Sequence, residues 1–227
     1  MNAALLLLAD GRFPSGGHAH SGGAEPAVGV GDITHLESLR DFVTGRLHTA
    51  GLVDAAFASA VCSRCIAGKV GAETWVELEA EYLARTASPR LRIASRTLGR
   101  QLLRGARRAF PSARFDEAVG ALGTSIPQPI VMGIAAAAAG CTPVDAALCE
   151  LHHMVGSLTS AGVRLLGIDP FEIAAFGAAL VPTLEALAAE AASTADAAPA
   201  ELPADVALLN DVLAEHHSTW EVRLFAS

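Results

Sequence analysis

Three pairs of a helix-capping residue followed by proline divide this chain into helical segments. The pairs are Ser88-Pro89, Thr142-Pro143 and Asp169-Pro170. Proline suits the first position of a helix because its φ angle is already helical, and the side chain before it caps the free amides. Beyond Thr142, apolar residues recur at spacings of three and four from Leu148 to Leu165, which indicates one buried face. No segment alternates like a strand, so the sequence predicts an all-α, single-domain bundle of roughly eight to ten helices over residues 1–227.

The composition is apolar for a chain of this length. Of the 227 residues, 52% are hydrophobic and 18% are charged, and the mean hydropathy is +0.39. The longest apolar run, Pro129–Cys141, is shorter than the roughly 18–20 residues that cross a bilayer, and the Leu5–Leu8 run lacks the basic flank of a signal peptide. We therefore expect a cytoplasmic protein without membrane contact, whose surplus apolar surface is covered by a second copy or by partners. The net charge of −8 argues against general binding of nucleic acid.

Three further segments have a character of their own. Residues 1–25 hold an apolar run and a glycine-rich loop, in which Gly16-Gly17 and Gly22-Gly23 permit close approach to another element. Residues 191–204 are rich in Ala, Ser, Thr and Pro, which favours a flexible linker. Residues 218–227 form a tail in which Leu224 and Phe225 stand side by side, and this favours docking into a groove over a frayed terminus.

An arginine ladder is the clearest electrostatic feature of the sequence. The helix predicted from Pro89 carries an arginine at every fourth position, namely Arg92, Arg96, Arg100, Arg104 and Arg108. One interpretation is a solvated face that pairs in part with the acidic residues of the preceding helix. The other is a docking strip for an acidic partner, because arginine is favoured over lysine at interfaces. Nucleic acid is a weaker candidate, since no aromatic residues interleave for base stacking.

Candidate metal ligands and catalytic groups are sparse. His18 and His20 lie in the glycine-rich loop, but two imidazoles need at least one more ligand to hold zinc or nickel. Cys62 and Cys65 form a lone C-x-x-C without a second pair or a βαβ context, so buried helix cysteines are the better interpretation. The sequence contains no nucleophile elbow, P-loop or H-E-x-x-H motif. We therefore predict a protein that is not an enzyme and that holds no resident cofactor.

The glycine-rich loop and four later blocks resemble the urease accessory protein UreF family. The loop is similar to the family signature at Pro14, Gly16, Gly17, Ser21, Gly22, Gly23 and Glu25. The central blocks are Arg92-x-x-Ser95-Arg96-x-x-Gly99-Arg100, Pro129-Ile130-Val131-x-Gly133 and Ser160-Ala161-x-Val163-Arg164-Leu165. The C-terminal block is His217 followed by Arg223-Leu224-Phe225-x-Ser227. Together the blocks cover nearly the whole chain in the family's order.

The resemblance implies a non-catalytic, all-helical protein that dimerises. Members of the family dock the accessory protein UreD, called UreH in some bacteria, and recruit the nickel-carrying GTPase UreG, so that the assembly delivers nickel to apo-urease and modulates the GTPase. The resemblance places the UreD/UreH-docking function in the tail, at His217, Arg223, Leu224, Phe225 and Ser227. It adds Arg92, Arg96 and Arg100 as partner-binding candidates. Nickel is then handled by the complex and is not bound tightly by this chain.

Two other functions stay open at this point. One is a metal-binding helical protein or enzyme that uses His18 and His20, and the other is a helical adaptor for another GTPase. The chain also departs from the family pattern, because His18 and His20 stand where many members have aromatic residues and Ala226 replaces a residue that is frequently basic. The family's P-L-G-Q segment is here Gly167-Ile168-Asp169-Pro170, so no role of that glutamine is transferred.

Overall fold

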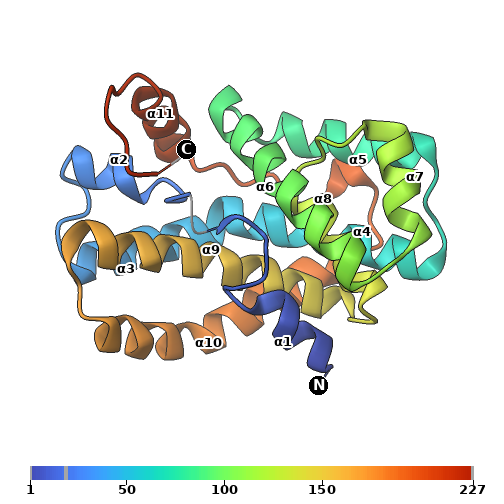
Figure 1. The fold of residues 1–227 in the computed structure, drawn as a ribbon, viewed down its shortest axis with the longest axis horizontal. Coiled ribbons are helices and arrows are strands. Elements are labelled where there is room, and N and C mark those ends of the chain that lie inside the picture. The colour runs from blue at the N-terminus through green and yellow to red at the C-terminus, as the bar shows by residue number, and fades with distance from the viewer. Residues whose placement is uncertain (1, 18–19, 226–227) are drawn as a thin grey trace.

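A computed structural model describes residues 2–17 and 20–225 of the chain. With the continuous run Leu36–Ala67 counted as one helix, these residues form ten α-helices and no β-strand. The all-α fold predicted from the sequence is therefore confirmed. Figure 1 shows α5 to α8 on one side of the molecule and α2, α3 and α11 on the other, with α4 and α9 reaching into both.

The helices begin where the capping signals place them. Ser88, Thr142 and Asp169 each accept a hydrogen bond from an amide of the following first turn, and a proline occupies the next position. Gly167 adopts φ = 66° directly after α9, which ends that helix. The elements are α1 (Ala3–Ala9), α2 (Ala24–Gly29), α3 (Leu36–Arg46), a π-helical turn (Leu47–Gly51), α4 (Leu52–Ala67), α5 (Ala72–Ala84), α6 (Pro89–Ala109), α7 (Ala113–Leu122), α8 (Gln128–Ala138), α9 (Pro143–Leu166), α10 (Pro170–Ser193), a 3-10 turn (Pro199–Glu201) and α11 (Leu208–His217).

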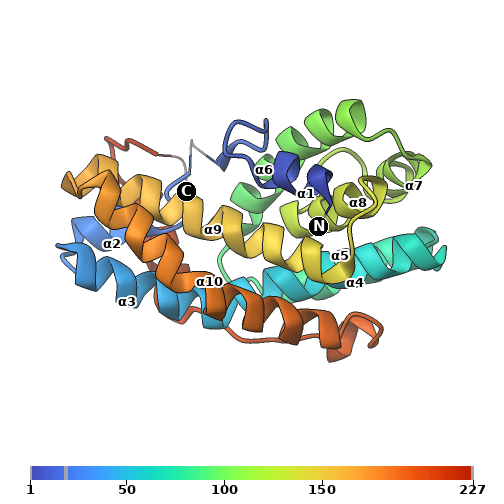
Figure 2. The same cartoon turned by 90° about the horizontal axis from the view of Figure 1, so that it is seen from below.

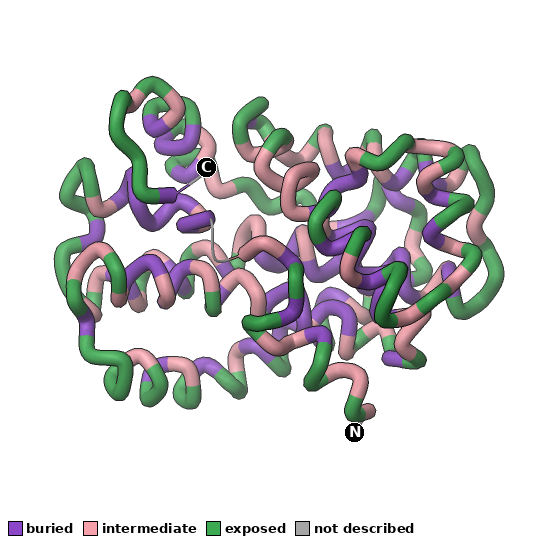
Figure 3. The backbone as a smooth tube through the Cα atoms, viewed as in Figure 1, coloured by how far each residue is buried: buried purple, intermediate pink, exposed green. Residues whose placement is uncertain are grey.

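Two hydrophobic clusters form the core and share the central helices α4 and α9. One cluster joins α4 to α5, α6, α7 and α8, and Phe57 and Trp75 are its largest buried side chains. The other joins α4 and α9 to α3 and α10, with Leu47 and Leu151 among its fully buried members. Figure 2 shows α10 packed across α4 and α9, and Figure 3 shows the buried segments gathered in the middle of the molecule. Because both clusters include residues of α4 and α9, these two helices connect the two sides of the molecule.

The segment 191–204 is packed against the body of the protein, which corrects the flexible linker predicted from its composition. Its first residues complete α10, and Ala195 and Leu202 are buried. Arg64 of α4 donates hydrogen bonds to the carbonyl oxygens of Ala195 and Ala197. Arg85 donates to four further carbonyls, those of Pro199, Ala200, Leu202 and Pro203. Small residues leave the backbone carbonyls open, and two guanidinium groups use them as acceptors.

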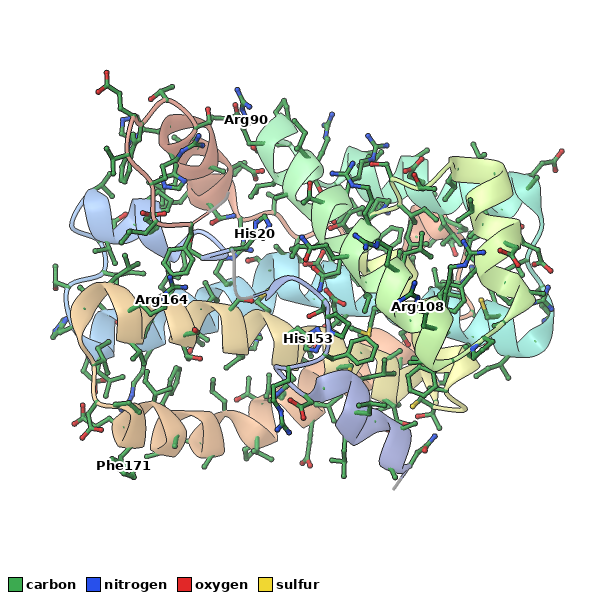
Figure 4. All side chains as sticks on the ribbon, viewed as in Figure 1. His20, Arg90, Arg108, His153, Arg164 and Phe171 are labelled. Atoms are coloured by element: carbon green, nitrogen blue, oxygen red, sulfur yellow. The ribbon has the colours of Figure 1, made fainter. Side chains whose placement is uncertain are left out.

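Two helical runs have the length and composition of a membrane-spanning segment. They are Leu36–Ala67 and α10, and polar residues interrupt both, so neither stands out in the sequence as an unbroken apolar stretch. In the first run, 67% of the most apolar 18-residue stretch is buried, so this run is explained as a core helix. For α10 the buried share is 28%, and Phe171 at its start is 84% exposed (Figure 4). The outer face of α10 is therefore apolar and largely exposed in the described chain.

Candidate functional site

The glycine-rich loop is wedged between three helices. Four of its glycines lie so close to a helix that an added Cβ would clash with a side chain or crowd it. The side chains concerned are Gln101 of α6 at Gly16, Ser157 and Leu158 of α9 at Gly17 and Gly22, and Asn210 of α11 at Gly23. Gly23 also adopts φ = 98° as the residue before α2, a conformation that other residues rarely adopt. Pro14 is exposed and lies against Gly105 of α6, while Ser21 is buried. These contacts hold the described parts of the loop against the three helices, and the side chain of Glu25, which follows the loop, is buried.

Glu25 holds the C-terminal tail through its carboxylate. Oε1 accepts the backbone N–H of Leu224 at 2.7 Å, and Oε2 accepts that of Phe225 at 3.0 Å. Oε2 also lies 3.0 Å from Nε2 of His217, the last residue of α11. Burial lowers the pKa of His217, and this effect outweighs the opposing effect of the carboxylate. We call this arrangement of Glu25, His217 and the tail the Glu25 clasp.

The clasp sorts the tail residues into buried and exposed ones. Phe225 is 4% exposed, and the guanidinium of Arg164 lies 4.3 Å above its ring, while His217 is fully buried. Leu224, in contrast, is 67% exposed, and Arg223 is exposed as well. Of the residues predicted to contact a partner, Phe225 and His217 thus point into their own chain. Ser227 lies outside the described residues.

The arginine ladder is split between intramolecular and free positions. Arg96 pairs with Glu79 of α5 at 3.0 Å, and Arg92 donates from Nε to the carbonyl oxygen of Thr86 at 2.6 Å. Arg100 is exposed and bonds to the hydroxyls of Thr97 and Ser125, which leave its charge uncompensated. Cross-helix pairing with α5 therefore accounts for part of the ladder, as one of the two interpretations predicts.

A partly open cavity of about 240 Å³ lies beneath the glycine-rich loop. It is lined by the loop and by α4, α6 and α9, and its polar groups include Arg46, Asp54, Tyr82 and Glu150. Tyr82 donates its hydroxyl to Asp54 at 3.0 Å. Burial raises the pKa of Asp54 to about 6, and burial together with the nearby Asp54 holds the pKa of Glu150 well above its usual range.

Histidines and cysteines are placed separately. His20 is buried at the cavity wall. Nε2 of His153 lies 2.8 Å from the carbonyl oxygen of Leu8, and burial lowers the pKa of His153 to about 4. Figure 4 labels both histidines. His18 lies outside the described residues, so the predicted His18/His20 pair is not tested. Within the described ranges, no three His, Cys, Asp or Glu side chains are grouped to hold a metal ion. All four cysteines are buried thiols, as predicted for Cys62 and Cys65, and burial raises the pKa of both to about 12.

Sequence reasoning missed the cavity acids and the partners of the tail. Asp54 and Glu150 each interrupt a run of buried apolar positions, which is a signal that the sequence contained. No comparable signal exists for the contact of Glu25 with Leu224, because those residues are 199 positions apart. The stacking of Arg164 on Phe225 is equally a product of the tertiary fold.

Comparison with known proteins decides the family. A family model described as UreF matches residues 33–181, well over half of the chain. The chain belongs to the UreF family. Urease accessory protein UreF of Mycobacterium sp. (strain JLS) is 41% identical over 224 residues, which are 98% of this chain and 97% of that protein. The UreF protein of Mycobacterium tuberculosis (strain ATCC 25618 / H37Rv) is 36% identical over 225 residues, with 99% and 98% of the two chains covered.

Membership of the UreF family confirms the resemblance found in the sequence. The relatives are named urease accessory proteins, and the family consists of non-catalytic factors of urease maturation, so this chain is not an enzyme. The site to be explained is therefore a set of contact surfaces. The candidates in this fold are the exposed tail residues at the Glu25 clasp, the exposed arginines of α6 and the exposed apolar side of α10.

Proposed function

We propose that this chain is a scaffold subunit of the urease maturation complex. In this role it bridges UreD/UreH and the GTPase UreG, and it modulates the GTPase while nickel is inserted into apo-urease. It acts in the cytoplasm, and nickel stays with the complex. The observation that carries the proposal is the Glu25 clasp, because it holds an exposed apolar segment in one position and so lowers the entropy that a partner has to remove on binding.

The docking surface for UreD/UreH is formed by the tail and the outer face of α11. Val222 is 82% exposed and Leu224 is 67% exposed, and both lie on the segment that Glu25 fixes. Three apolar side chains of α11 are exposed nearby in the sequence, namely Leu208, Leu209 and Val212. Phe225 and His217 contribute from inside, as anchors of the segment. This assignment keeps the tail as the docking element and changes which of its residues touch the partner.

A second copy of the chain accounts for the apolar face of α10. That helix combines high hydropathy with little burial, and Phe171 stands almost fully in solvent at its first turn. The charged residues of α10 are Glu172, Glu185 and Glu190, and the helix contains no lysine or arginine. A homodimer in which these faces meet would remove the exposed apolar side of α10 from water.

Replacement of Leu224 by aspartate tests the docking surface. We expect Leu224→Asp to weaken co-purification with the cognate UreD/UreH by about tenfold or more in affinity, because a charge would enter an apolar contact. Val76→Asp is the matched control, since Val76 is also an exposed apolar residue, 52% exposed, but lies on α5. Wild-type protein that is folded and fails to capture UreD/UreH would overturn the proposal itself. Equal binding by both variants would move the docking surface elsewhere.

A further inference from the structure

Helix α6 carries more positive charge than its own chain neutralises. It contains seven arginines and no acidic residue, in a protein whose net charge is −8. Arg96 pairs with Glu79 and Arg107 pairs with Asp116 of α7. Arg100, Arg104 and Arg108 are exposed, and none of them forms an ion pair in the described part of the chain. Like charges four residues apart on a helix repel one another, so this set is unfavourable for the isolated chain.

Four of the seven arginines of α6 lie on one side of the helix. Arg90 and Arg108 are 18 residues apart, which is five full turns, so the helical period places them on the same side of α6. Figure 4 labels them at opposite ends of the helix. At about 100° per residue, Arg100 and Arg104 fall within about 80° of that direction. Ile93, which is 57% exposed, falls in the same arc. We call these residues, Arg90, Ile93, Arg100, Arg104 and Arg108, the arginine strip.

Arg92 and Arg96, which have partners within the chain, lie outside this arc. Arg92 and Arg96 are about 160° and 120° from the direction of Arg90, on the side that reaches Thr86 and Glu79. The chain therefore engages the arginines outside the arc and leaves Arg100, Arg104 and Arg108 without an ion pair among the described residues. A solvated helix face would not require this separation, because interspersed acidic residues would remove the repulsion at no cost to packing.

The residue types of the strip favour carboxylates as the ligand. Every cation in it is arginine, whose planar guanidinium binds a carboxylate through two parallel hydrogen bonds. Nucleic acid offers phosphates to the same groups, but the strip has no aromatic side chain for a base, and the overall charge of the protein opposes a polyanion of that length. An apolar residue flanked by arginines is the composition of a protein interface.

The strip is continuous with the docking surface of the tail. Its first residue, Arg90, donates its backbone N–H to Glu215 of α11 at 3.0 Å, and Ser88 donates its own N–H to Asp211 at 2.9 Å. Helix α11 is thus fixed to the N-terminal end of α6. A partner seated on α11 has the strip beside it, and Figure 1 shows the two helices next to each other.

We propose that the arginine strip is a docking surface for an acidic face of a protein partner, with rows of Asp or Glu side chains opposite Arg100, Arg104 and Arg108. This inference deepens the scaffold function proposed above and rests on it for the identity of the partner. It transfers the partner-binding role from Arg92 and Arg96, which are engaged within the chain, to the bare positions of the same helix.

Two probes test the strip in the full-length protein. Binding of fluorescein-labelled poly-L-glutamate and of a labelled DNA duplex is measured by fluorescence anisotropy, at about 50 and about 300 mM NaCl, on either side of physiological ionic strength. We expect Arg104→Glu and Arg108→Glu each to weaken poly-L-glutamate binding about tenfold at low salt and to flatten its salt dependence. Lys69→Glu is the matched control, because it makes the same charge change at an exposed position after α4. Circular dichroism confirms that each variant is folded.

The outcomes separate the strip from the scaffold function. The strip is not a site for acidic protein if the strip variants bind poly-L-glutamate as tightly as the Lys69→Glu variant does. The same conclusion follows if the wild type binds DNA more tightly than poly-L-glutamate and the strip variants lose the binding of DNA. The same variants are then used to capture UreD/UreH and UreG. A complex that assembles equally well with strip variants supports the scaffold and overturns the strip. Strip-dependent binding of poly-L-glutamate by a wild-type chain that captures neither protein supports the strip and overturns the scaffold.

Discussion

Glu25 connects two parts of the chain that the sequence separates by 199 and 200 residues. Its carboxylate accepts hydrogen bonds from two backbone amides of the tail and lies next to His217. The Glu25 side chain is buried at this site. Charge-assisted hydrogen bonds in such a site are stronger than neutral ones. The position of Leu224 on the surface therefore depends on one buried acid in the glycine-rich loop.

Replacement of Glu25 by alanine is expected to free the tail. Two amides would lose a charged acceptor, which costs about 1.5–3 kcal/mol per bond to a charged group, so the tail would detach while the helices persist. Hydrogen exchange of the amides of Leu224 and Phe225 should become fast, with the helical signal in circular dichroism unchanged. Glu185→Ala, on the exposed face of α10, serves as the control. Unchanged protection of the tail amides in Glu25→Ala would show that the clasp does not hold the tail.

Close packing of α8 on α4 depends on glycine at one position. A Cβ on Gly133 would collide with the carbonyl oxygen of Ala58 and lie 2.6 Å from Cβ of Val61. Neither atom is the end of a flexible side chain, so α8 would have to move away from the core helix. The P-I-V-x-G block that resembles the family thus has a packing reason for its glycine.

Gly133→Ala is therefore expected to lower the free energy of unfolding by about 1–3 kcal/mol, the range for overpacked cores. Gly120→Ala in α7 is the matched change, because no atom lies within 4 Å of the added methyl group there. Alanine at that helical position should instead stabilise the protein by about 0.5–1 kcal/mol. Urea denaturation of both variants measures the two effects. Equal stabilities would contradict the close approach of α8 to α4.

The molecule as a whole encloses titratable groups whose protonation differs between the folded and unfolded states. Burial holds the pKa of Glu150 well above its ordinary value of 4.5. The folded protein therefore keeps a proton that the unfolded chain releases above that pH. Stability then decreases as the pH rises, by about 1.4 kcal/mol per pH unit, until the buried carboxyl ionises. The lowered pKa of His153 acts in the opposite direction between about 4 and 6.5.

Glu150→Gln isolates the contribution of this acid. The amide cannot ionise, so the variant should gain stability relative to the wild type as the pH rises from about 5 to about 8, with the sign given by the raised pKa. Unfolding free energies in urea at several pH values measure the difference. Glu77→Gln removes an exposed carboxyl of α5 and should leave the pH dependence of the wild type unchanged. A difference between Glu150→Gln and wild type that does not vary with pH would show that Glu150 is ionised in both states.

Local chemistry in the sequence was sufficient to place the starts of three long helices. Capping residues followed by proline mark where α6, α9 and α10 begin, because such signals act within one helical turn. The same reasoning found the burial of the cysteines and the amphipathic α6. It was wrong for residues 191–204, where composition suggested a linker and two distant arginines hold the backbone. The short helix α7 carries a serine cap at Ser112 that was available to sequence reasoning and was not used.

The sequence by itself determined the helical elements, the family blocks and the lack of any catalytic motif, since each of these is written in residues close together along the chain. The tertiary structure alone decided which tail residues are buried, which arginines are already paired and where Asp54 and Glu150 meet. These features arise from contacts between helices, and the energy of such a contact depends on distance in space and on enclosure from water, neither of which a linear pattern encodes.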